Sequence, residues 1–277
     1  LLVAYMPWFG YNFEDAIVAN ENLVTDGQMN WQYEKNYSKY LLPGFEPDLQ
    51  NGLAKVGCKI SNGDTLVEFS QNENTENLVH DGDDGILTDL DYIKPISEIF
   101  GGMIKWRVKY TIPLQVGSKF MARYGNKGVI SKFYTPDQMP RLPDDTNLPE
   151  NLRGRSVDLV LNPHGVISRM NLGQLLETQY SLAMSMGLKA PTNIGTAFEQ
   201  LDHSELSNFF ESKTPFDKYG RIKMQFGDGS FTNSPVTIGY EYFTVLKHIP
   251  SKKAHARRGR NNSDRYNQIT GQPVGGK

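Results

Sequence analysis

Short strand-forming runs separated by turn signals are the feature that most constrains the fold of this chain. The segment 104–114 alternates apolar and polar residues, and 157–163 is a continuous apolar run typical of a buried strand. Two further strand-type runs, 56–60 and 64–69, flank a turn signal at 61–63. Regular alternation of strands with helices is absent, so the pattern predicts a β-rich α+β protein rather than a doubly wound sheet.

Helical periodicity is concentrated in one segment. Leucines recur at helical spacing over 168–188, and Ser168 is a candidate start residue. A second helix is predicted over 195–212. The polar stretch 71–85 and the proline-rich stretch 140–155 are expected to be exposed loops.

Composition favours a folded chain with one unusual charged segment. Of the 277 residues, 38% are hydrophobic and 22% are charged, which allows a packed core. The net charge of −2 conceals a basic run over 247–265 that holds one acid, Asp264. Such a run suits phosphate contacts. The alternative is a solvated tail, which composition alone favours.

Cysteine content and hydropathy bear on the cellular compartment of the protein and on the kinds of site that it can contain. Cys58 is the single cysteine, so an internal disulfide and a cysteine-rich zinc site are excluded. The first fifteen residues lack the basic flank of a secretory leader, and no apolar run has the length of a membrane span. We therefore expect a cytoplasmic protein with no zinc and no membrane partner. Both ends, Leu1 and QPVGGK, are expected to be cuts through a larger sequence.

Three motifs carry charged residues suited to phosphate or metal chemistry. Glu14 and Asp15 in YNFEDAI are adjacent carboxylates, which either assist a Mg²⁺ ion or form a turn. GSKFMARYGNKG (117–128) sets cations among glycines that allow close backbone approach, yet it is no Walker A loop because Gly128 follows Lys127. A basic surface turn is the alternative for that motif. Its cations are Lys119, Arg123 and Lys127.

The third motif, NPHGVISRMNLGQ (162–174), places Arg169 at a predicted strand-to-helix junction. A cation at a helix N-terminus is locally unfavourable, which suggests a bound anion nearby. His164 is expected to be structural. The acidic run HDGDDG (80–85) lacks the spacing of a calcium loop or of a polymerase aspartate loop, and 227–229 is expected to be a hairpin turn.

Five segments taken in order resemble the successive motifs of the β subunit of multisubunit DNA-dependent RNA polymerase. The likeness covers most of the chain and is poor over 25–100 and 180–225. The segments are AYMPWFGYNFEDAIV, KFMARYGNKGVIS, VDLVLNPHGVISRMNLGQLLE, PVTIGYEYFTVLKH and KKAHAR followed by QPVGGK.

The resemblance implies a domain layout. Residues 1–20 with 105–180 would form part of a double-psi β-barrel, and 21–104 would be an inserted, β-rich flap or wall module. Residues 181–240 would be a helical and hairpin connector. Residues 241–277 would be a basic hybrid-binding segment, incomplete at its C-terminal end.

The resemblance also implies residue roles. Lys119 and Lys127 would contact the RNA 3′ end or incoming phosphates, and Arg169 would contact the triphosphate of the incoming nucleotide. Glu14 and Asp15 would lie near the second, nucleotide-borne Mg²⁺. The expected nucleic-acid contacts are Arg123, Lys253, His255 and Arg257.

Catalysis would be shared, because no aspartate loop for the principal Mg²⁺ is present in this sequence. That loop would come from a β′-type partner. Further partners would be the N-terminal half of β, the DNA template, RNA and a promoter-specificity factor. A complete single-chain polymerase is excluded by the missing loop, and a non-catalytic assembly or regulatory protein is the competing hypothesis.

Departures from the family pattern indicate a divergent origin. Ser118 replaces the usual Asp before Lys119, Tyr124 stands in a His position, and His164 replaces a Leu. The sequence between His255 and the terminal motif is longer than usual. These features favour a split subunit of the kind that large bacteriophages encode, acting in the host cytoplasm. A fragment of an ordinary bacterial β subunit is the alternative.

Overall fold

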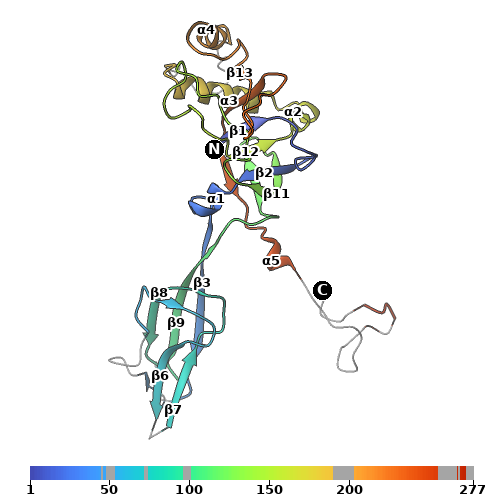
Figure 1. Cartoon of the computed structure of the whole chain (residues 1–277). Coiled ribbons are helices and arrows are strands. Elements are labelled where there is room, and N and C mark those ends of the chain that lie inside the picture. Colours follow the sequence, from blue (N-terminus) through green and yellow to red (C-terminus); the bar gives the residue numbers. More distant parts are fainter. Residues whose placement is uncertain are drawn as a thin grey trace. The chain divides into compact units, whose positions relative to one another are not determined.

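The computed structural model describes 1–44, 46–47, 54–71, 74–95, 101–189, 203–254, 267 and 269–272. The chain divides into two compact units. Unit 1 comprises Leu1–Met29 and Gln115–Lys277, and unit 2 comprises Asn30–Leu114. Both are drawn in Figure 1, and each is described by itself.

Unit 1 is built on a mixed eight-stranded sheet. β1 runs parallel to β12 and β2 runs parallel to β11, while the other neighbours are antiparallel. The strands are short and apolar, and all four residues of β1 are buried. In sheet order they are β13 (Arg221–Ile222), β14 (Val236–Tyr240), β1 (Leu2–Tyr5), β12 (Leu159–Leu161), β2 (Ala16–Asn20), β11 (Lys127–Tyr134), β10 (Lys119–Ala122) and β15 (Phe243–Val245).

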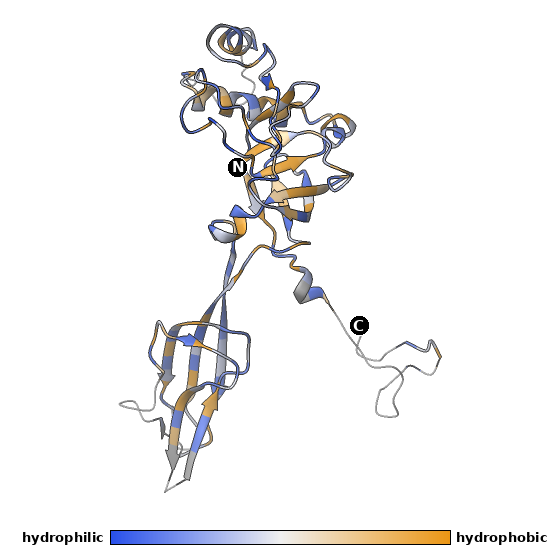
Figure 2. Ribbon diagram, viewed as in Figure 1, coloured by the Kyte–Doolittle hydropathy of each residue, from blue (hydrophilic) through white to orange (hydrophobic). Residues whose placement is uncertain are grey.

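Helices complete the core of unit 1. The longest, α3, lies against β14 so closely that a side chain at Gly239 would collide with the backbone oxygen of Thr178. Buried side chains from the sheet and from two of the helices, such as Val160, Leu182 and Phe210, belong to one hydrophobic cluster. Figure 2 shows the hydrophobic colouring gathered on the central strands. The helices are α1 (Asn22–Thr25), α2 (Pro163–Arg169), α3 (Leu172–Ser185), α4 (His203–Lys213) and α5 (Pro250–Lys253).

Unit 2 contains two antiparallel sheets around its own core. The larger has the order β3 (Trp31–Tyr40), β9 (Met103–Ile112), β8 (Gly85–Ile93) and β5 (Lys59–Ile60). The smaller has the order β4 (Glu46–Pro47), β6 (Thr65–Gln71) and β7 (Asn74–Val79). Leu66, Leu87 and Val108 are fully buried between them.

Most of the predicted strands are confirmed, and the loop prediction for 71–85 is wrong over 74–79. There β7 pairs with β6, because the hairpin is held by backbone bonds that polar side chains do not prevent, whereas 80–84 forms no helix or strand and 72–73 lies outside the described residues. The compact units have other limits than the expected module 21–104: β9 pairs with β3 from end to end, so 105–112 lies in unit 2, while 21–29 lies in unit 1.

The predicted helix over 168–188 is interrupted. Asn162 caps an earlier helix, α2, by accepting a hydrogen bond from the His164 amide at 3.0 Å, and Pro163 occupies its first turn. Met170 then adopts a left-handed conformation with φ of 52° and ends α2 before α3 begins. Ser168 therefore lies inside a helix rather than at its start. Of the predicted helix over 195–212, α4 confirms the part from His203 onward, and 195–202 lies outside the described residues.

In the part of the chain that the structure describes, no helix is both long and apolar enough to cross a membrane.

The central strand β11 provides a direct test of the unit 1 core. Ile130 is fully buried between β2 and β10, whereas Ile167 on α2 is 72% exposed. Ile130→Ala should lower the free energy of unfolding by about 2–5 kcal/mol, because it removes packed methyl groups and leaves a cavity. The matched control, Ile167→Ala, should change it by less than about 0.5 kcal/mol in the same urea titration. Equal losses from the two variants would contradict this packing.

Candidate functional site

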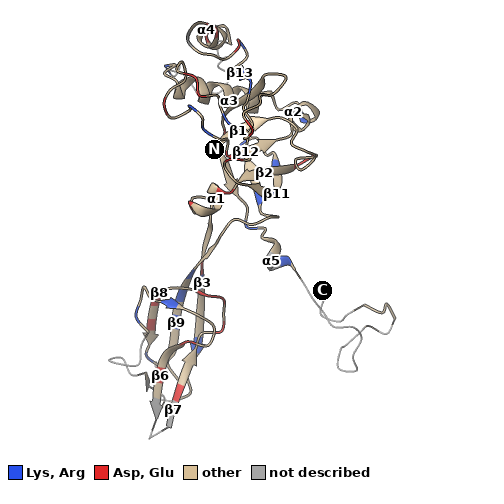
Figure 3. Cartoon of the chain, in the orientation of Figure 1, with Lys and Arg blue, Asp and Glu red and all other residues tan. Residues whose placement is uncertain are grey.

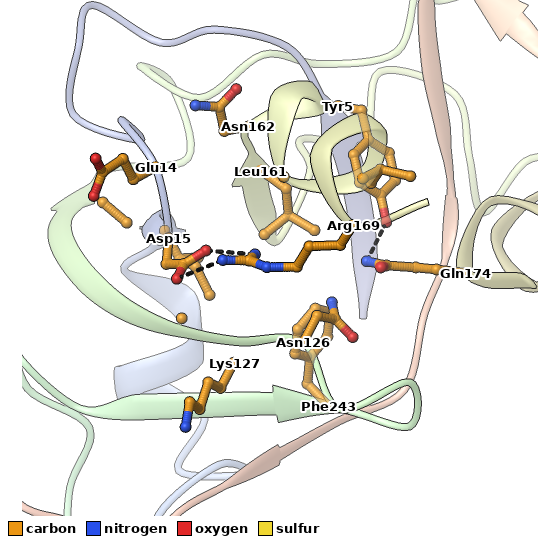
Figure 4. Close-up of a pocket in the computed structure, with 15 residues that line it drawn as sticks. Tyr5, Glu14, Asp15, Asn126, Lys127, Leu161, Asn162, Arg169, Gln174 and Phe243 are labelled. Atoms are coloured by element: carbon orange, nitrogen blue, oxygen red, sulfur yellow. Dashed lines mark hydrogen bonds and ion pairs between the residues drawn. The ribbon is translucent and has the colours of Figure 1, made fainter. Parts of the chain in front are cut away.

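A pocket in unit 1 gathers four of the sequence-predicted site residues, Glu14, Asp15, Lys127 and Arg169. Its volume is about 50 Å³, and it shares five lining residues with a neighbouring hollow of about 370 Å³. The pocket is formed where the β1–β2 loop, the start of β11, α2 and the first turn of α3 meet (Figure 4).

Arg169 and Asp15 face each other across this pocket. Two guanidinium nitrogens of Arg169 donate to the two carboxylate oxygens of Asp15 at 2.6 and 2.9 Å. The hydrogen bonds and charge of Asp15 raise the pKa of Arg169 above its usual value. Both side chains remain nearly half exposed, so the pair is accessible from solvent. An exposed ion pair of this kind contributes little to stability and can exchange partners.

Local backbone features set this geometry. β11 approaches the β1–β2 loop so closely that a Cβ on Gly128 would lie 2.6 Å from the backbone oxygen of Asp15. The Val129 amide also donates to that oxygen at 3.0 Å. Glu14, one residue earlier, has a left-handed φ of 53° and is exposed. The turn thus depends on glycine at position 128.

The electrostatic argument made for Arg169 from sequence is wrong. Arg169 is the last residue of α2, where a cation is favoured by the helix dipole rather than disfavoured. The asparagine–proline start of α2 at 162–163 was the sequence signal for this arrangement. Arg169 still lines the pocket, and Asp15 is the anion that it contacts.

Lys119 and Lys127 lie on one face of the β10–β11 hairpin. Lys119 is opposite Val129, and Lys127 is opposite Met121. Cross-strand partners share a face and so do residues two apart, so the two lysines are diagonal neighbours on the outer face. The alternate residue Phe120 is buried in the core. In Figure 4 the Lys127 ammonium points away from the Arg169–Asp15 pair.

More cations lie near the hairpin. β15 pairs with β10, and the Leu246 amide donates to Lys119 O at 2.8 Å, which carries the chain to Lys247 and His248 beside the hairpin. The charge of Lys253 lowers the pKa of His248 most, followed by desolvation and then by three more lysines, Lys119, Lys247 and Lys127. Figure 3 shows basic residues on β11 and α5. Among the described residues none of these four lysines forms an ion pair. We call Lys119, Lys127, Lys247, His248 and Lys253 the basic cluster.

His248 was not singled out from sequence. It lies in the basic run that begins at Lys247. The sequence thus indicated a basic segment here but not which part of the fold it contacts. The structure shows this contact: the pairing of β15 with β10 brings the start of the basic run close to Lys119.

Three other predicted residues have different outcomes. Arg123 donates to Glu177 at 2.5 Å and lies over the ring of Tyr242, 5.3 Å from its centroid. His255 and Arg257 lie outside the described residues.

The acidic pair does not fit a metal site formed by this chain alone. Asp15 uses both carboxylate oxygens on Arg169, which leaves Glu14. Within the described ranges, no group of three or more histidine, cysteine, aspartate or glutamate side chains could hold a metal ion. Glu14 and Asp15 alone therefore do not complete a ligand set for Mg²⁺, which commonly takes one or two carboxylates together with phosphate oxygens.

Sequence reasoning also missed a buried carboxyl group behind the pocket. Glu241 is 3% exposed, and the Tyr5 hydroxyl donates to its Oε2 at 2.7 Å. Gln174 Nε2 in turn donates to that hydroxyl at 2.7 Å, as Figure 4 shows. Tyr5 and Gln174 both line the pocket. A single Glu between two strand-type runs has no sequence signature of burial.

Two glycines beside the pocket provide a matched test of its backbone geometry. Gly128→Ala should destabilise the protein by about 1–3 kcal/mol, because the new methyl group must displace the Asp15 backbone. Gly165→Ala, inside α2 with its nearest atom 3.7 Å away, should be neutral or stabilising by up to about 1 kcal/mol. Urea unfolding of both variants measures the difference. A Gly128→Ala variant as stable as Gly165→Ala would show that β2 and β11 do not approach this closely.

Comparisons with known proteins identify the family of this chain. The profile of RNA polymerase Rpb2, domain 6, matches residues 1–82 and 47–277. The chain is similar to proteins named DNA-directed RNA polymerase subunit beta. The one from Alkaliphilus metalliredigens (strain QYMF) is 30% identical over 329 residues, with 100% of this chain and 25% of the relative covered. The one from Clostridioides difficile (strain 630) is 27% identical over 325 residues, with the same coverage.

The chain spans about a quarter of the length of these curated relatives. The family profile nevertheless extends over both units. This chain therefore belongs to the RNA polymerase Rpb2 domain 6 family, within the β subunits of DNA-directed RNA polymerases.

Proposed function

We propose that this chain works as a subunit of a DNA-directed RNA polymerase and positions the RNA 3′ end, the RNA–DNA hybrid and the incoming nucleoside triphosphate. The observation that carries this proposal is the basic cluster: Lys119 and Lys127 share one face of the β10–β11 hairpin, and the other lysines of the cluster lie near His248 beside it. Phosphate oxygens are the ligands that such a face suits. The family membership supplies the reaction.

Roles for single residues follow from their surroundings. Lys119 and Lys127 would neutralise phosphates of the RNA 3′ end or of the nucleotide, as point charges on a fixed hairpin. Arg169 would bind the triphosphate by exchanging Asp15 for phosphate oxygens, since its fork suits both groups. Arg123 would contact nucleic acid on release from Glu177. Lys253, with His255 and Arg257, would lie along the hybrid.

The units have corresponding roles in this proposal. Unit 1 would contribute part of a double-psi β-barrel, and unit 2 would be the inserted flap or wall module. The segment 181–240 would connect the barrel to 241–277, which would follow the hybrid. The mixed sheet of unit 1, with its parallel β1–β12 and β2–β11 pairs, supports a barrel assignment.

The principal Mg²⁺ would belong to a β′-type partner that carries the aspartate loop, because the acidic pair here lacks a ligand set. Glu14 and Asp15 would act only indirectly, near a nucleotide-borne ion. Other partners would be the remaining β sequence, DNA, RNA and a promoter-specificity factor. The assembly would act in the cytoplasm, that of a bacterial host if the chain is phage-encoded.

A second candidate is a non-catalytic assembly protein. The observation that favours it is that Arg169 and Arg123 are both engaged by carboxylates of the same chain. That role gives no reason for Lys119, Lys127 and Lys253 to gather around His248. Variants of these lysines therefore separate the two candidates.

Lys119→Ala and Lys127→Ala, each tested in the assembled enzyme, should slow RNA extension by on the order of 100-fold or more while assembly survives. The matched control is Lys223→Ala, an exposed lysine that follows β13 at the other edge of the sheet. It should extend RNA at the wild-type rate. Wild-type extension by both hairpin variants would refute the proposed function and leave the assembly role.

Salt dependence tests the phosphate contacts separately. Affinity of the assembled enzyme for an RNA–DNA hybrid should fall as salt rises, because counterions are released on binding. Lys253→Ala should reduce the slope of log affinity against log salt by about 0.7–0.9. The Lys223→Ala slope should match that of the wild type. An unchanged slope for Lys253→Ala would remove that residue from the interface.

A further inference from the structure

Glu241 is a buried acid for which the proposed function has no use. It lies between β14 and β15, and its Oε2 accepts the Tyr5 hydroxyl at 2.7 Å. Its Oε1 is buried and has no hydrogen-bond partner in the described part of the chain, and the same is true of Asn126 Oδ1. The Asn126 and Gln174 side chains also interact with the Glu241 carboxyl. Burial favours the protonated form of this carboxyl group, while its hydrogen bonds with Tyr5, Asn126 and Gln174 act in the opposite direction and lower its pKa.

The groups that Glu241 contacts belong to the walls of the pocket. Asn126 precedes Lys127 at the start of β11, and Gln174 lies in the first turn of α3, shortly after Arg169. Both side chains line the pocket, together with Tyr5. Glu241 thus joins the segment that carries Lys127 to the segment that carries Arg169.

The surroundings of Glu241 act on its charge in both directions, and the effect of burial is the largest. Tyr5 on β1 lies next to the Glu241 carboxyl group, and the Leu1 amino group donates to the Glu241 backbone oxygen at 2.9 Å. Glu177 on α3 and Tyr124 in the β10–β11 turn also lie near it. No described residue forms an ion pair with Glu241, and Glu177 is itself paired with Arg123. Burial, with the negative charge of Glu177 adding to it, raises the pKa of Glu241 to about 7.

We propose that Glu241 is a positioning residue: as the neutral acid it binds Tyr5, Asn126 and Gln174 together and so fixes the two segments that present Lys127 and Arg169. Its ionisation places a charge in this buried site, which favours opening of the connection, so the pocket geometry depends on pH near neutrality. The structural part stands independently of the proposed function. Its consequence for nucleotide addition rests on that function.

The sign of the pH dependence follows from linkage. The folded protein holds the Glu241 proton more tightly than the unfolded chain, because the folded pKa is raised above the ordinary value of 4.5. This stabilisation is complete below that ordinary value and is lost as the pH rises through about 7. The thermal midpoint of the full chain should therefore fall by roughly 5 °C or more between acidic and mildly alkaline pH.

Thermal unfolding of the full chain from acidic to mildly alkaline pH tests this. Glu241→Gln cannot ionise and should abolish the fall in midpoint attributed to this group. Glu211→Gln, the same change at an exposed position on α4, should retain it. An infrared band of a protonated carboxyl should be present at pH 6 in the wild type and missing from Glu241→Gln. A full midpoint fall or an unchanged band in Glu241→Gln would overturn the proposal.

Tyr5→Phe keeps the proposal testable should Glu241→Gln fail to fold. The Tyr5 hydrogen bond lowers the pKa of Glu241, so its removal should move the midpoint fall to higher pH. A shift to lower pH, or no shift, would contradict the assignment.

The positioning role of Glu241 can be measured separately from its effect on stability. Hydrogen exchange in 119–129, corrected for its intrinsic pH dependence, should accelerate through neutrality in the wild type and not in Glu241→Gln. In the assembled enzyme, the ratio of wild-type to Glu241→Gln extension rates should fall as the pH rises. Failure of the lysine variants to slow extension would refute the proposed function, whereas constant exchange in wild-type 119–129 would refute the positioning role alone.

Discussion

The close approach of β11 to the β1–β2 loop at Gly128 is the constraint on which the site depends. With no side chain at this position, the Val129 amide reaches the Asp15 backbone oxygen at 3.0 Å, and β2 continues as the parallel neighbour of β11. One contact thereby places Asp15 at the pocket and Lys127 at its edge. The bidentate pair with Arg169 then joins α2 to the same loop.

Charge is divided unequally around this contact. On the pocket side, Arg169 and Asp15 neutralise each other. Separating the two side chains costs little free energy, because both are exposed. On the hairpin face, the basic cluster has no such partner among the described residues. The described residues thus combine a region of unpaired positive charge with one arginine that is paired to an exposed carboxylate. Glu241 is buried behind the pocket and has no cationic partner among the described residues. Burial raises its pKa, which makes the geometry of the pocket walls sensitive to pH in our proposal.

The sequence predicted local features well and tertiary ones poorly. Strand 104–114 and the apolar run 157–163 were recognisable because burial on one or both faces leaves a periodic pattern. The loop prediction for 71–85 failed over 74–79 because backbone pairing with β6 overrides polar composition. Glu14, Asp15, Arg169 and the hairpin lysines were found through motif resemblance, whereas their grouping came only with the sheet register. Glu241 was invisible because its burial is decided by α3 and β1, which are distant in sequence.

The most direct test of the central claim is a cross-linking map from the RNA 3′ end in the assembled elongation complex. RNA carrying an amine-reactive group at its 3′-terminal nucleotide should attach to Lys119 or Lys127, the diagonal lysines of the β10–β11 hairpin. The pocket and the basic cluster would then share one nucleic-acid substrate. Attachment only to lysines of unit 2, or to Lys223 beyond β13, would contradict the account.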